Sequence, residues 1–515
     1  MIHHGVLIAA WIVGLIALIA LASWGAHRSY RKFLQKVQGP ASSALPVSGP
    51  QTPLDALLEP LETQHAGESG LMLLLDNADA FTARALSAAQ AGRSLDLMYY
   101  IWSTDQAGWL LMDALVAAAD RGVRIRLLLD DVNVQGFDPA FLALSQHKMI
   151  DVRLFNPSLH HGHGLRRMLE FALGLSRFNR RMHGKLWIAD GRLAVIGGRN
   201  IGNTYFGADE GNRISVDADI MLVGSKVAEV SAVFDSFWNL GLSLPIAAVW
   251  PAFTLNRTAF CKRVARHVGT APSRRFLAQT IKGRSADTFL TQPLRWTSKV
   301  QLLADPPDKV YGQQSTPWMS TAVAGILATA KTDVRLITPY FVPGEAGITG
   351  LTRLIARGVR VSLLTNALSS TDIVAVHGAY RHYRGPLLAA GGHIHEYAKP
   401  ALPGRKRDVI HSKIFLMDGR QAIVGSLNFD LRSAFTNTEL GLLFEEPELL
   451  AELTAMCDSL CGPEQSYHVT RHGKALHWNV ARPGLPRNMT VEPEARWRRR
   501  AVSWIVGHLP IQNFL

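Results

Sequence analysis

The fold of this chain is decided by the stretch HSKIFLMDGRQAIVGSLNFD, residues 411–430, in which three polar groups interrupt an apolar run. Side chains two residues apart in a β-strand point to the same face. The imidazole of His411 and the ammonium of Lys413 are therefore expected to lie together. Asp418 follows at the end of the strand, before a Gly-Arg turn, and QAIVG predicts a second strand beyond it.

The same pattern occurs a second time. HGKLWIADGRLAVIGGRN, residues 183–200, matches residues 411–428 at an offset of 228, with His, Lys, Asp, a pair of small residues and Asn in register. A further match joins residues 121–130 to residues 357–366 at an offset of 236. Repeated core strands would preserve only apolar character, so the repeated polar residues predict two halves of one site. The chain is two copies of one long unit rather than an array of short repeats.

Alternating strands and helices place the chain in the α/β class. SLDLMYYIW predicts a buried strand, GWLLMDALVAAADRG a helix that ends at Gly122, and VRIRLLLDD a second strand. The second copy begins at Asp333 with the same order of elements. A strand, a helix and a strand in succession form a βαβ unit, which predicts a largely parallel sheet.

Two facing halves would gather basic and amide side chains around one small volume. The set comprises His183, Lys185, Asn200, His411, Lys413 and Asn428, and the small residues Gly198 and Ser426 would let the backbone approach a ligand. Ammonium groups and amide donors match the oxygens of a phosphoryl group. A neutral histidine can attack phosphorus while a protonated one donates to the leaving oxygen. Since the lysines neutralise charge, neither a metal nor a cofactor is expected.

Each histidine needs a partner that holds it in one tautomer. An acidic residue follows each half, Asp219 in DADIMLVG and Glu439 in NTELGLLF, and the two segments align. These are the expected histidine-orienting residues, and Glu439 is assigned to His411, the histidine of its own half.

The duplicated motif resembles the paired HxKxxxxD motifs of the phospholipase D superfamily. Around it, YYIWSTDQAG, FNRRMHGK, GGRNIGNTYFG, PYFVPGEAG and GSLNFDLRSAFTNTELG look like bacterial cardiolipin synthases of the C-type branch, over residues 65–515. The resemblance implies two pseudo-symmetric phospholipase D-like α/β/α domains with the active site at their interface. It also implies transfer of a phosphatidyl group to the hydroxyl of a second lipid through a covalent phosphatidyl-histidine.

The same resemblance implies roles for the motif residues. His183 would be the nucleophile and His411 the general acid, although the pseudo-symmetry leaves the reverse assignment open. Asp190 and Asp418, the aspartates of the two motifs, are structural in the family. The substrates would be phosphatidylglycerol with a second phosphatidylglycerol or with phosphatidylethanolamine. Because one chain carries both halves, no oligomer is required to complete the site.

Other activities stay open on the residues alone. A phospholipase D hydrolase would use water in the second step and release phosphatidic acid. A nuclease of the same superfamily would suit the net charge of +13. DNA requires no lipid interface, however, so nucleic acid is not the expected partner. A non-catalytic membrane scaffold would have no use for two intact sets of His, Lys and Asn.

The N-terminal segment predicts a membrane anchor. Residues 5–26 carry no charged side chain, which matches the roughly 20 apolar residues that cross a bilayer. Arg28, Arg31 and Lys32 follow, so the positive-inside rule predicts a single-pass anchor in the bacterial inner membrane with a cytoplasmic body. A cleaved signal peptide with a processing site at Ala20–Ala22 is the alternative. The absence of a basic start and the basic run after the segment favour the uncleaved anchor.

The predicted organisation has five parts: an anchor over residues 1–36, a linker over 37–64, phospholipase D-like domains over 65–300 and 301–465, and a basic-aromatic tail over 466–515. Residues 165–182 and the tail interleave arginines with apolar side chains, so each is either a surface helix or a lipid-facing segment. The histidines of LHHGHG, residues 159–164, are expected to form a solvated loop, because no carboxylate or thiolate accompanies them as a metal ligand.

Overall fold

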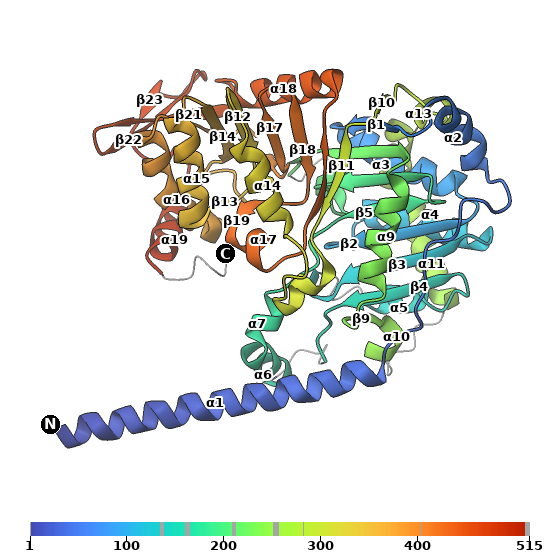
Figure 1. Ribbon diagram of the computed structural model, residues 1–515, viewed down its shortest axis with the longest axis horizontal. Coiled ribbons are helices and arrows are strands. Elements are labelled where there is room, and N and C mark those ends of the chain that lie inside the picture. The colour runs from blue at the N-terminus through green and yellow to red at the C-terminus, as the bar shows by residue number, and fades with distance from the viewer. Residues whose placement is uncertain are drawn as a thin grey trace.

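Two α/β halves lie side by side in the protein, and helix α1 (Ile2–Lys36) runs beneath them in the view of Figure 1. The computed structural model describes residues 2–133, 138–159, 165–208, 213–250, 257–281, 283–401 and 403–509 of the 515-residue chain. The three histidines of LHHGHG, at positions 160, 161 and 163, lie outside the described residues.

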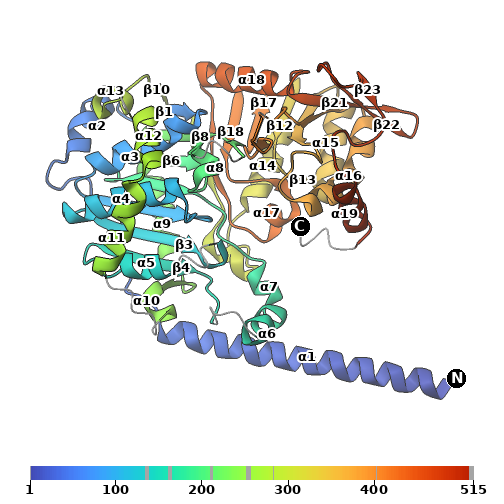
Figure 2. The same ribbon diagram turned by 180° about the vertical axis from the view of Figure 1, so that it is seen from behind.

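The first half is built on a nine-stranded sheet of order β10-β1-β8-β6-β5-β2-β3-β4-β9. Its strands are β1 (Ser69–Leu74), β2 (Ser94–Tyr99), β3 (Arg124–Asp130), β4 (Ile150–Phe155), β5 (Leu186–Ala189), β6 (Leu193–Gly197), β8 (Asp219–Gly224), β9 (Ser243–Pro245) and β10 (Arg295–Thr297). Helices α3 (Asn77–Gln90) and α4 (Gln106–Asp120) cover one face, which is turned to the viewer in Figure 2. Helix α9 (Val227–Trp238) packs on the other face.

The second half is built on a ten-stranded sheet of order β11-β20-β18-β17-β12-β14-β15-β21-β22-β23. Its strands are β11 (Val300–Ala304), β12 (Asp333–Ile337), β14 (Arg360–Asn366), β15 (His393–Tyr397), β17 (Ile414–Met417), β18 (Gln421–Gly425), β20 (Leu440–Phe444), β21 (Ser466–His472), β22 (Ala475–Asn479) and β23 (Asn488–Met489). Helices α14 (Met319–Ala328), α15 (Gly344–Ala356) and α16 (Val374–Ala389) contribute to the core on its outer face, and α18 (Pro447–Cys461) packs on the inner face.

Both sheets are mixed, so the largely parallel sheet expected from the sequence was wrong. Among the described strands of the two sheets, parallel pairing is confined to β2-β3-β4 and β12-β14-β15. The motif strands instead form the hairpins β5–β6 and β17–β18. A tight hairpin can join only antiparallel strands, so each motif ends the parallel run beside β2 or β12.

A buried core shared by the two halves fixes how they sit against each other. Strand β5 alternates, with Leu186 and Ile188 in the shared core and Trp187 and Ala189 in the core under α3 and α4. Strand β17 alternates in the same way between the shared core and the core of the second half. Helices α9 and α18 complete the shared core. The motif strands are therefore buried on both faces, which explains why they read as continuous apolar runs.

The predicted linker contains a folded helix. Helix α2 (Pro53–Gln64) begins at a capping box formed by Thr52 and Asp55, and it buries Leu54 and Leu58. Proline content predicted a linker, but Pro53 stands in the first helical turn, where proline is favourable.

The predicted tail also belongs to the body. Strands β21, β22 and β23 extend the second sheet, and helix α19 (Trp497–Gly507) packs against α16. The boundary placed at residue 465 therefore cuts through a continuous sheet.

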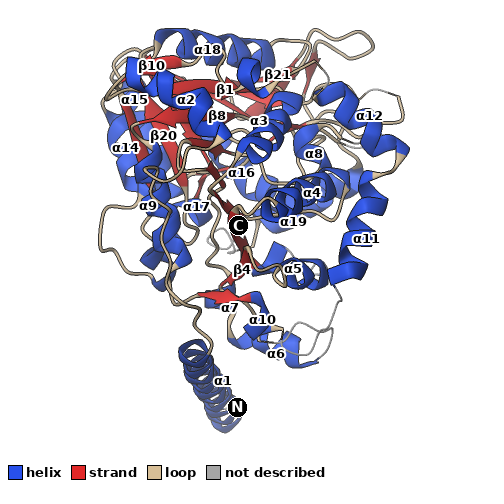
Figure 3. Cartoon of the chain, turned by 90° about the vertical axis from the view of Figure 1, so that its right-hand side faces the viewer, coloured by secondary structure: helices blue, strands red, loops and turns tan. Residues whose placement is uncertain are grey.

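Helix α1 projects away from the body, as the end-on view of Figure 3 shows. Its C-terminal end packs on the body through the buried Tyr30. No helix among the described residues combines the length and the apolar character needed to cross a bilayer. The single-pass anchor and the cytoplasmic body stay predictions from the sequence.

Two tryptophans test whether the C-terminal residues are part of the second half. Trp478 on β22 is 4% exposed, whereas Trp497 on α19 is 72% exposed. Removing the buried ring leaves a cavity, so Trp478→Ala is expected to lower the free energy of unfolding by about 3–5 kcal/mol. Trp497→Ala, the matched control, should cost less than about 0.5 kcal/mol. Thermal unfolding measures both. A detached tail would leave both variants melting at the wild-type temperature.

Candidate active site

Each histidine segment is hydrogen-bonded to the opposite half of the chain. The backbone N–H groups of His183 and Gly184 both donate to the carbonyl of Thr438, at 3.0 and 3.1 Å. In the other direction, His411 and Ser412 donate to the carbonyl of Val216 at 2.8 and 3.0 Å. The short strands β7 (Ser215–Val216) and β16 (Val409–Ile410) pair in parallel beside this contact. The two motifs are thus brought together by one chain, as expected from the sequence.

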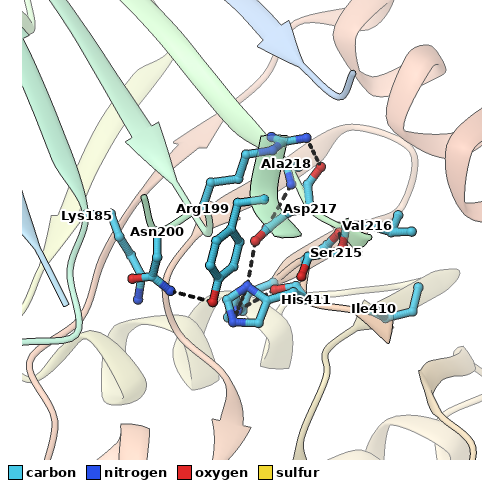
Figure 4. A network of polar contacts seen from close by, with 12 residues as sticks. Lys185, Arg199, Asn200, Ser215, Val216, Asp217, Ala218, Ile410 and His411 are labelled. Atoms are coloured by element: carbon cyan, nitrogen blue, oxygen red, sulfur yellow. Dashed lines mark hydrogen bonds and ion pairs between the residues drawn. The ribbon is translucent and has the colours of Figure 1, made fainter. Parts of the chain in front are cut away.

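The carboxylates that orient the histidines are exchanged between the halves. His183 Nδ1 lies 2.8 Å from Glu439 Oε2. His411 Nδ1 lies 2.6 Å from Asp217 Oδ2, and Figure 4 shows this second pair. A carboxylate at Nδ1 favours the tautomer with a proton there and leaves Nε2 for chemistry. Glu439 therefore serves His183, not the histidine of its own half to which it was assigned.

Asp219 has no histidine partner among the described residues, which corrects the expected orienting residue. Its Oδ2 accepts a hydrogen bond from the buried guanidinium of Arg84 at 2.9 Å, and its Oδ1 accepts one from the backbone N–H of Arg199 at 3.1 Å. Buried arginines need a carboxylate partner, and Asp219 supplies it. The residue that sequence reasoning missed is Asp217, two positions earlier.

Strand register is the signal that identifies Asp217. Asp219 on β8 and Gly441 on β20 stand opposite the equivalent glycine of the two hairpins. Asp217 and Glu439 therefore occupy equivalent positions, each two residues before. In DADI two aspartates alternate, and the sequence alignment took the second of them.

The two motif lysines, Lys185 and Lys413, each lie against the histidine two residues earlier in the chain. Lys185 Nζ donates to the carbonyl of His183, and Lys413 Nζ donates to that of His411. Lys413 Nζ also lies 3.2 Å from His411 Nε2. Both ammonium groups are buried and carry the same charge, so each disfavours the other.

Burial and neighbouring charge set the protonation of the site. Burial, followed by the charge of Lys413, lowers the pKa of Lys185 to about 7. Burial lowers the pKa of Lys413, while the charges of Asp217 and Glu439 oppose that shift. Burial and the two lysines hold the pKa of His183 well below its usual range. His183 is therefore neutral at physiological pH, which is the form of an imidazole that can act as a nucleophile.

The pKa of His411 is also set by burial and by lysine charge, and its carboxylate partner Asp217 lies closer to it than Glu439 lies to His183. Burial and Lys413 lower its pKa, and Asp217 acts in the opposite direction. Burial opposes ionisation of Asp217, but the positive charge of His411 and of Lys413 keeps the pKa of that carboxyl below its ordinary value. Burial raises the pKa of Glu439, the partner of His183, so Asp217 is the more firmly ionised of the two carboxylates and better stabilises a protonated imidazole.

The small residues of the motifs make room for the carboxylates. A Cβ on Gly198 would lie 2.1 Å from Asp217 Oδ1. At the equivalent position, Ser426 Oγ donates to Glu439 Oε2 at 2.5 Å. Both positions therefore adjoin the orienting carboxylates, and the contact of either residue with a phosphate stays a prediction.

The motif asparagines have different surroundings. Asn200 Oδ1 accepts from the backbone N–H of Ile101 at 3.1 Å, and its Nδ2 donates to Tyr205 OH at 3.0 Å. Asn428 Oδ1 is buried with no hydrogen-bond partner in the part of the chain that the structure describes. Phosphate binding by either amide stays a prediction.

Tyrosine rings border both histidines, which the sequence did not indicate. The Tyr100 and His183 ring centroids lie 4.9 Å apart, and those of Tyr205 and His411 lie 5.3 Å apart, both edge to face. These rings limit how each imidazole can turn.

The motif aspartates shape turns and have no contact with the histidines among the described residues. Asp190 and Asp418 have φ values of 54° and 55°, and the glycine after each also has a positive φ. Such a turn matches the twist of the hairpin it closes. Asp190 accepts from the backbone N–H groups of residues 92–94, and Asp418 from those of residues 331–333. Each aspartate ties its hairpin to the start of the neighbouring strand.

Comparison with known proteins identifies relatives over most of the chain. The family model described as "Cardiolipin synthase, PLD-like domain" matches residues 83–238 and 323–461. Cardiolipin synthase C of Escherichia coli strain K12 is 37% identical over 419 residues, which cover 76% of this chain and 85% of that protein. Cardiolipin synthase 1 of Bacillus anthracis is 25% identical over 435 residues, 83% of this chain and 74% of that protein.

A solved structure shares the fold. The crystal structure of phosphatidylserine synthase from Haemophilus influenzae Rd KW20 aligns with a TM-score of 0.54 and 12% sequence identity. The alignment covers 78% of this chain and 87% of that one. At this identity the likeness concerns the fold alone.

Proposed function

The chain belongs to the cardiolipin synthase family, the phosphatidyltransferases of the phospholipase D superfamily, and from this premise we propose that it joins two phospholipids through a covalent phosphatidyl-histidine. The observation that carries the proposal is the exchanged pairing of His183 with Glu439 and of His411 with Asp217. It leaves the two Nε2 atoms for in-line chemistry beside two buried ammonium groups.

In the first step, His183 Nε2 attacks the phosphorus of phosphatidylglycerol. The bond from phosphorus to the glycerol oxygen breaks, and protonated His411 donates its Nε2 proton to that oxygen. Free glycerol leaves, and the phosphatidyl group remains on His183. Lys185 and Lys413 neutralise the charge that gathers on the phosphoryl oxygens.

In the second step, neutral His411 takes the proton of the acceptor hydroxyl. The acceptor oxygen attacks phosphorus, the phosphorus–nitrogen bond to His183 breaks, and both histidines return to their starting forms. With a second phosphatidylglycerol as acceptor the product is diphosphatidylglycerol. Phosphatidylethanolamine as the first donor would release ethanolamine instead of glycerol.

Product analysis tests this proposal. The purified full chain is incubated with labelled phosphatidylglycerol, with and without phosphatidylethanolamine, and the lipids and released alcohols are identified by mass spectrometry. Diphosphatidylglycerol together with free glycerol or ethanolamine is the expected result. Phosphatidic acid as the sole product would make the chain a hydrolase, and DNA cleavage without lipid turnover would overturn the proposal.

Leaving-group chemistry tests the roles of the two histidines. A p-nitrophenyl phosphodiester needs no protonated leaving group, so His411→Ala should still form the covalent adduct and release one equivalent of nitrophenol. His183→Ala should form no adduct, because the nucleophile is gone. Both variants should lose turnover of the natural lipid by at least about 100-fold. Intact-protein mass spectrometry detects the adduct.

The carboxylates provide the matched comparison in that experiment. Because each orients the histidine of the other half, Asp217→Asn should behave like His411→Ala and Glu439→Gln like His183→Ala. The reverse pattern, with Glu439→Gln behaving like His411→Ala, would contradict the exchanged pairing. An adduct in His183→Ala but not in His411→Ala would interchange the two roles.

The pKa of Lys185 predicts an alkaline limb in the pH profile. Burial and Lys413 lower that pKa to about 7, so the free enzyme carries the ammonium below this pH and loses it above. Because kcat/KM reports the free enzyme, it should fall about tenfold per pH unit above about pH 7. A bound phosphodiester anion stabilises the ammonium, so kcat should fall only at higher pH. Lys185→Arg should remove the contribution of this ammonium, since a guanidinium does not titrate there, and leave only the shallower fall set by deprotonation of His411, whose pKa burial and Lys413 lower. A wild-type kcat/KM that stays level to about pH 9 would contradict the prediction.

A further inference from the structure

A cavity of about 620 Å³ lies between the C-terminal end of α1 and the body, apart from the two histidines. Helix α1 contributes His27 and Arg31, and the segment that leads to the first motif contributes Arg177 and Arg180. Tyr311 closes another side. Neither His183 nor His411 is among the described residues that line the cavity.

The lining is basic and lacks acidic side chains among its described residues. Arg177 is neutralised by Glu170, whose Oε1 lies 2.8 Å from Arg177 Nη2, and its guanidinium stacks 3.8 Å from the centre of the Tyr30 ring. Arg180 differs, because its Nη1 donates only to the carbonyls of residues 309 and 310, both at 3.3 Å, in the described structure. Those carbonyls carry no net charge, so its positive charge remains available.

Arg31 is exposed and has no carboxylate partner among the described residues. Its charge acts on the cavity wall, because it lowers the pKa of the Tyr311 hydroxyl, which burial raises. Arg31 and Arg180 therefore approach the same cavity from α1 and from the body, and no side chain in the described part of the chain neutralises the charge of either. This pair would hold a phosphate or another compact anion.

Exposed apolar side chains adjoin the basic cavity. On α1, Leu21 is 65% exposed and Trp24 is 59% exposed, about three and about two turns before Arg31. Helix α6 (Leu165–Leu173) packs against α1 (Figure 1), and its Leu165 and Met168 are 69% and 70% exposed. An amphipathic ligand would place its anionic head in the basic cavity and its apolar tail on the exposed apolar side chains. A free anion would contact only the cavity.

We propose that this cavity binds the phosphate-bearing headgroup of an anionic phospholipid as a second lipid site, separate from the histidine pair. Arg31 and Arg180 contact the phosphate, and the acyl chains lie along the apolar side chains of α1 and α6. This site is distinct from the proposed phosphatidyl transfer, because the lipid in it is bound and does not react.

Photolabelling of the full chain tests the site in a His183→Ala background, where turnover cannot consume the probe. The probe is short-chain phosphatidylglycerol with a photoreactive acyl chain, used below its micellar concentration with the protein in detergent. Labelled peptides, identified by mass spectrometry, are expected from α1 and α6. Unlabelled short-chain phosphatidylglycerol should displace the probe, and short-chain phosphatidylcholine should not.

Charge-matched variants distinguish lipid binding in the cavity from nonspecific attraction of an anionic lipid to a basic protein. Arg31→Ala with Arg180→Ala should weaken labelling of α1 and α6 by roughly 10-fold. Arg28→Ala with Lys32→Ala removes the same charge from exposed positions of α1 outside the cavity lining, and should weaken it by less than about twofold. Arg31→Ala alone, at an exposed position, should show a partial loss even if the double variant unfolds.

Three outcomes would overturn the proposal. Equal losses in the two double variants would mean attraction by net charge alone. Displacement by inorganic phosphate at the same concentration as the lipid would mean a free-anion site. Labelling confined to peptides of the two histidine motifs would mean that the active site holds the only lipid. Because no turnover is measured, each of these outcomes leaves the phosphatidyl-transfer proposal untouched.

Discussion

The exchange of carboxylates between the halves is the constraint on which the rest of the structure depends. Each histidine lies on one half while its Nδ1 partner comes from the other, at 2.8 Å for His183 and 2.6 Å for His411. Backbone hydrogen bonds from the histidine segments to Thr438 and Val216 run in the same crossed direction. A displacement of the halves would therefore break both pairs at once, and the shared apolar core between the two sheets holds them in register.

Pseudo-symmetry explains the shape of the site, but its departures from symmetry separate the two histidines. Glu439 accepts hydrogen bonds from both His183 and Ser426, whereas the equivalent serine is replaced by Gly198 beside Asp217. The shorter side chain of Asp217 occupies the space beside Gly198 that a Cβ would fill. Asp217 Oδ1 accepts from the backbone N–H of Ala218 at 2.9 Å, which leaves its Oδ2 to His411, whereas His183 shares Glu439 Oε2 with Ser426. A protonated general acid needs this arrangement more than a neutral nucleophile does.

The sequence alone predicted the two-copy organisation, the motif hairpins, the family and the meeting of the two motifs, because repeated polar residues in register have no purpose in a core. It failed where the answer depends on contacts between distant segments. DADI offers two aspartates, and only the pairing of β8 with β6 shows that Asp219 belongs to Arg84 and Arg199 while Asp217 reaches His411. Composition likewise failed to predict α2 and the C-terminal strands. These segments have few apolar residues, and their burial depends on contacts with a sheet formed by distant parts of the chain.

Charge balance connects the buried site to the order of the chemistry. Before substrate binds, two ammonium groups face two carboxylates, so neutral histidines leave the cluster without net charge. A phosphodiester brings one negative charge, which lowers the free energy of a proton on an imidazole nearby. That imidazole is His411, because Asp217 raises its pKa, whereas the pKa of His183 is held well below its usual range. In the proposed mechanism, substrate binding would therefore protonate His411 when a leaving oxygen is present to receive its proton. Departure of the alcohol would then return His411 to the neutral form that the second step requires.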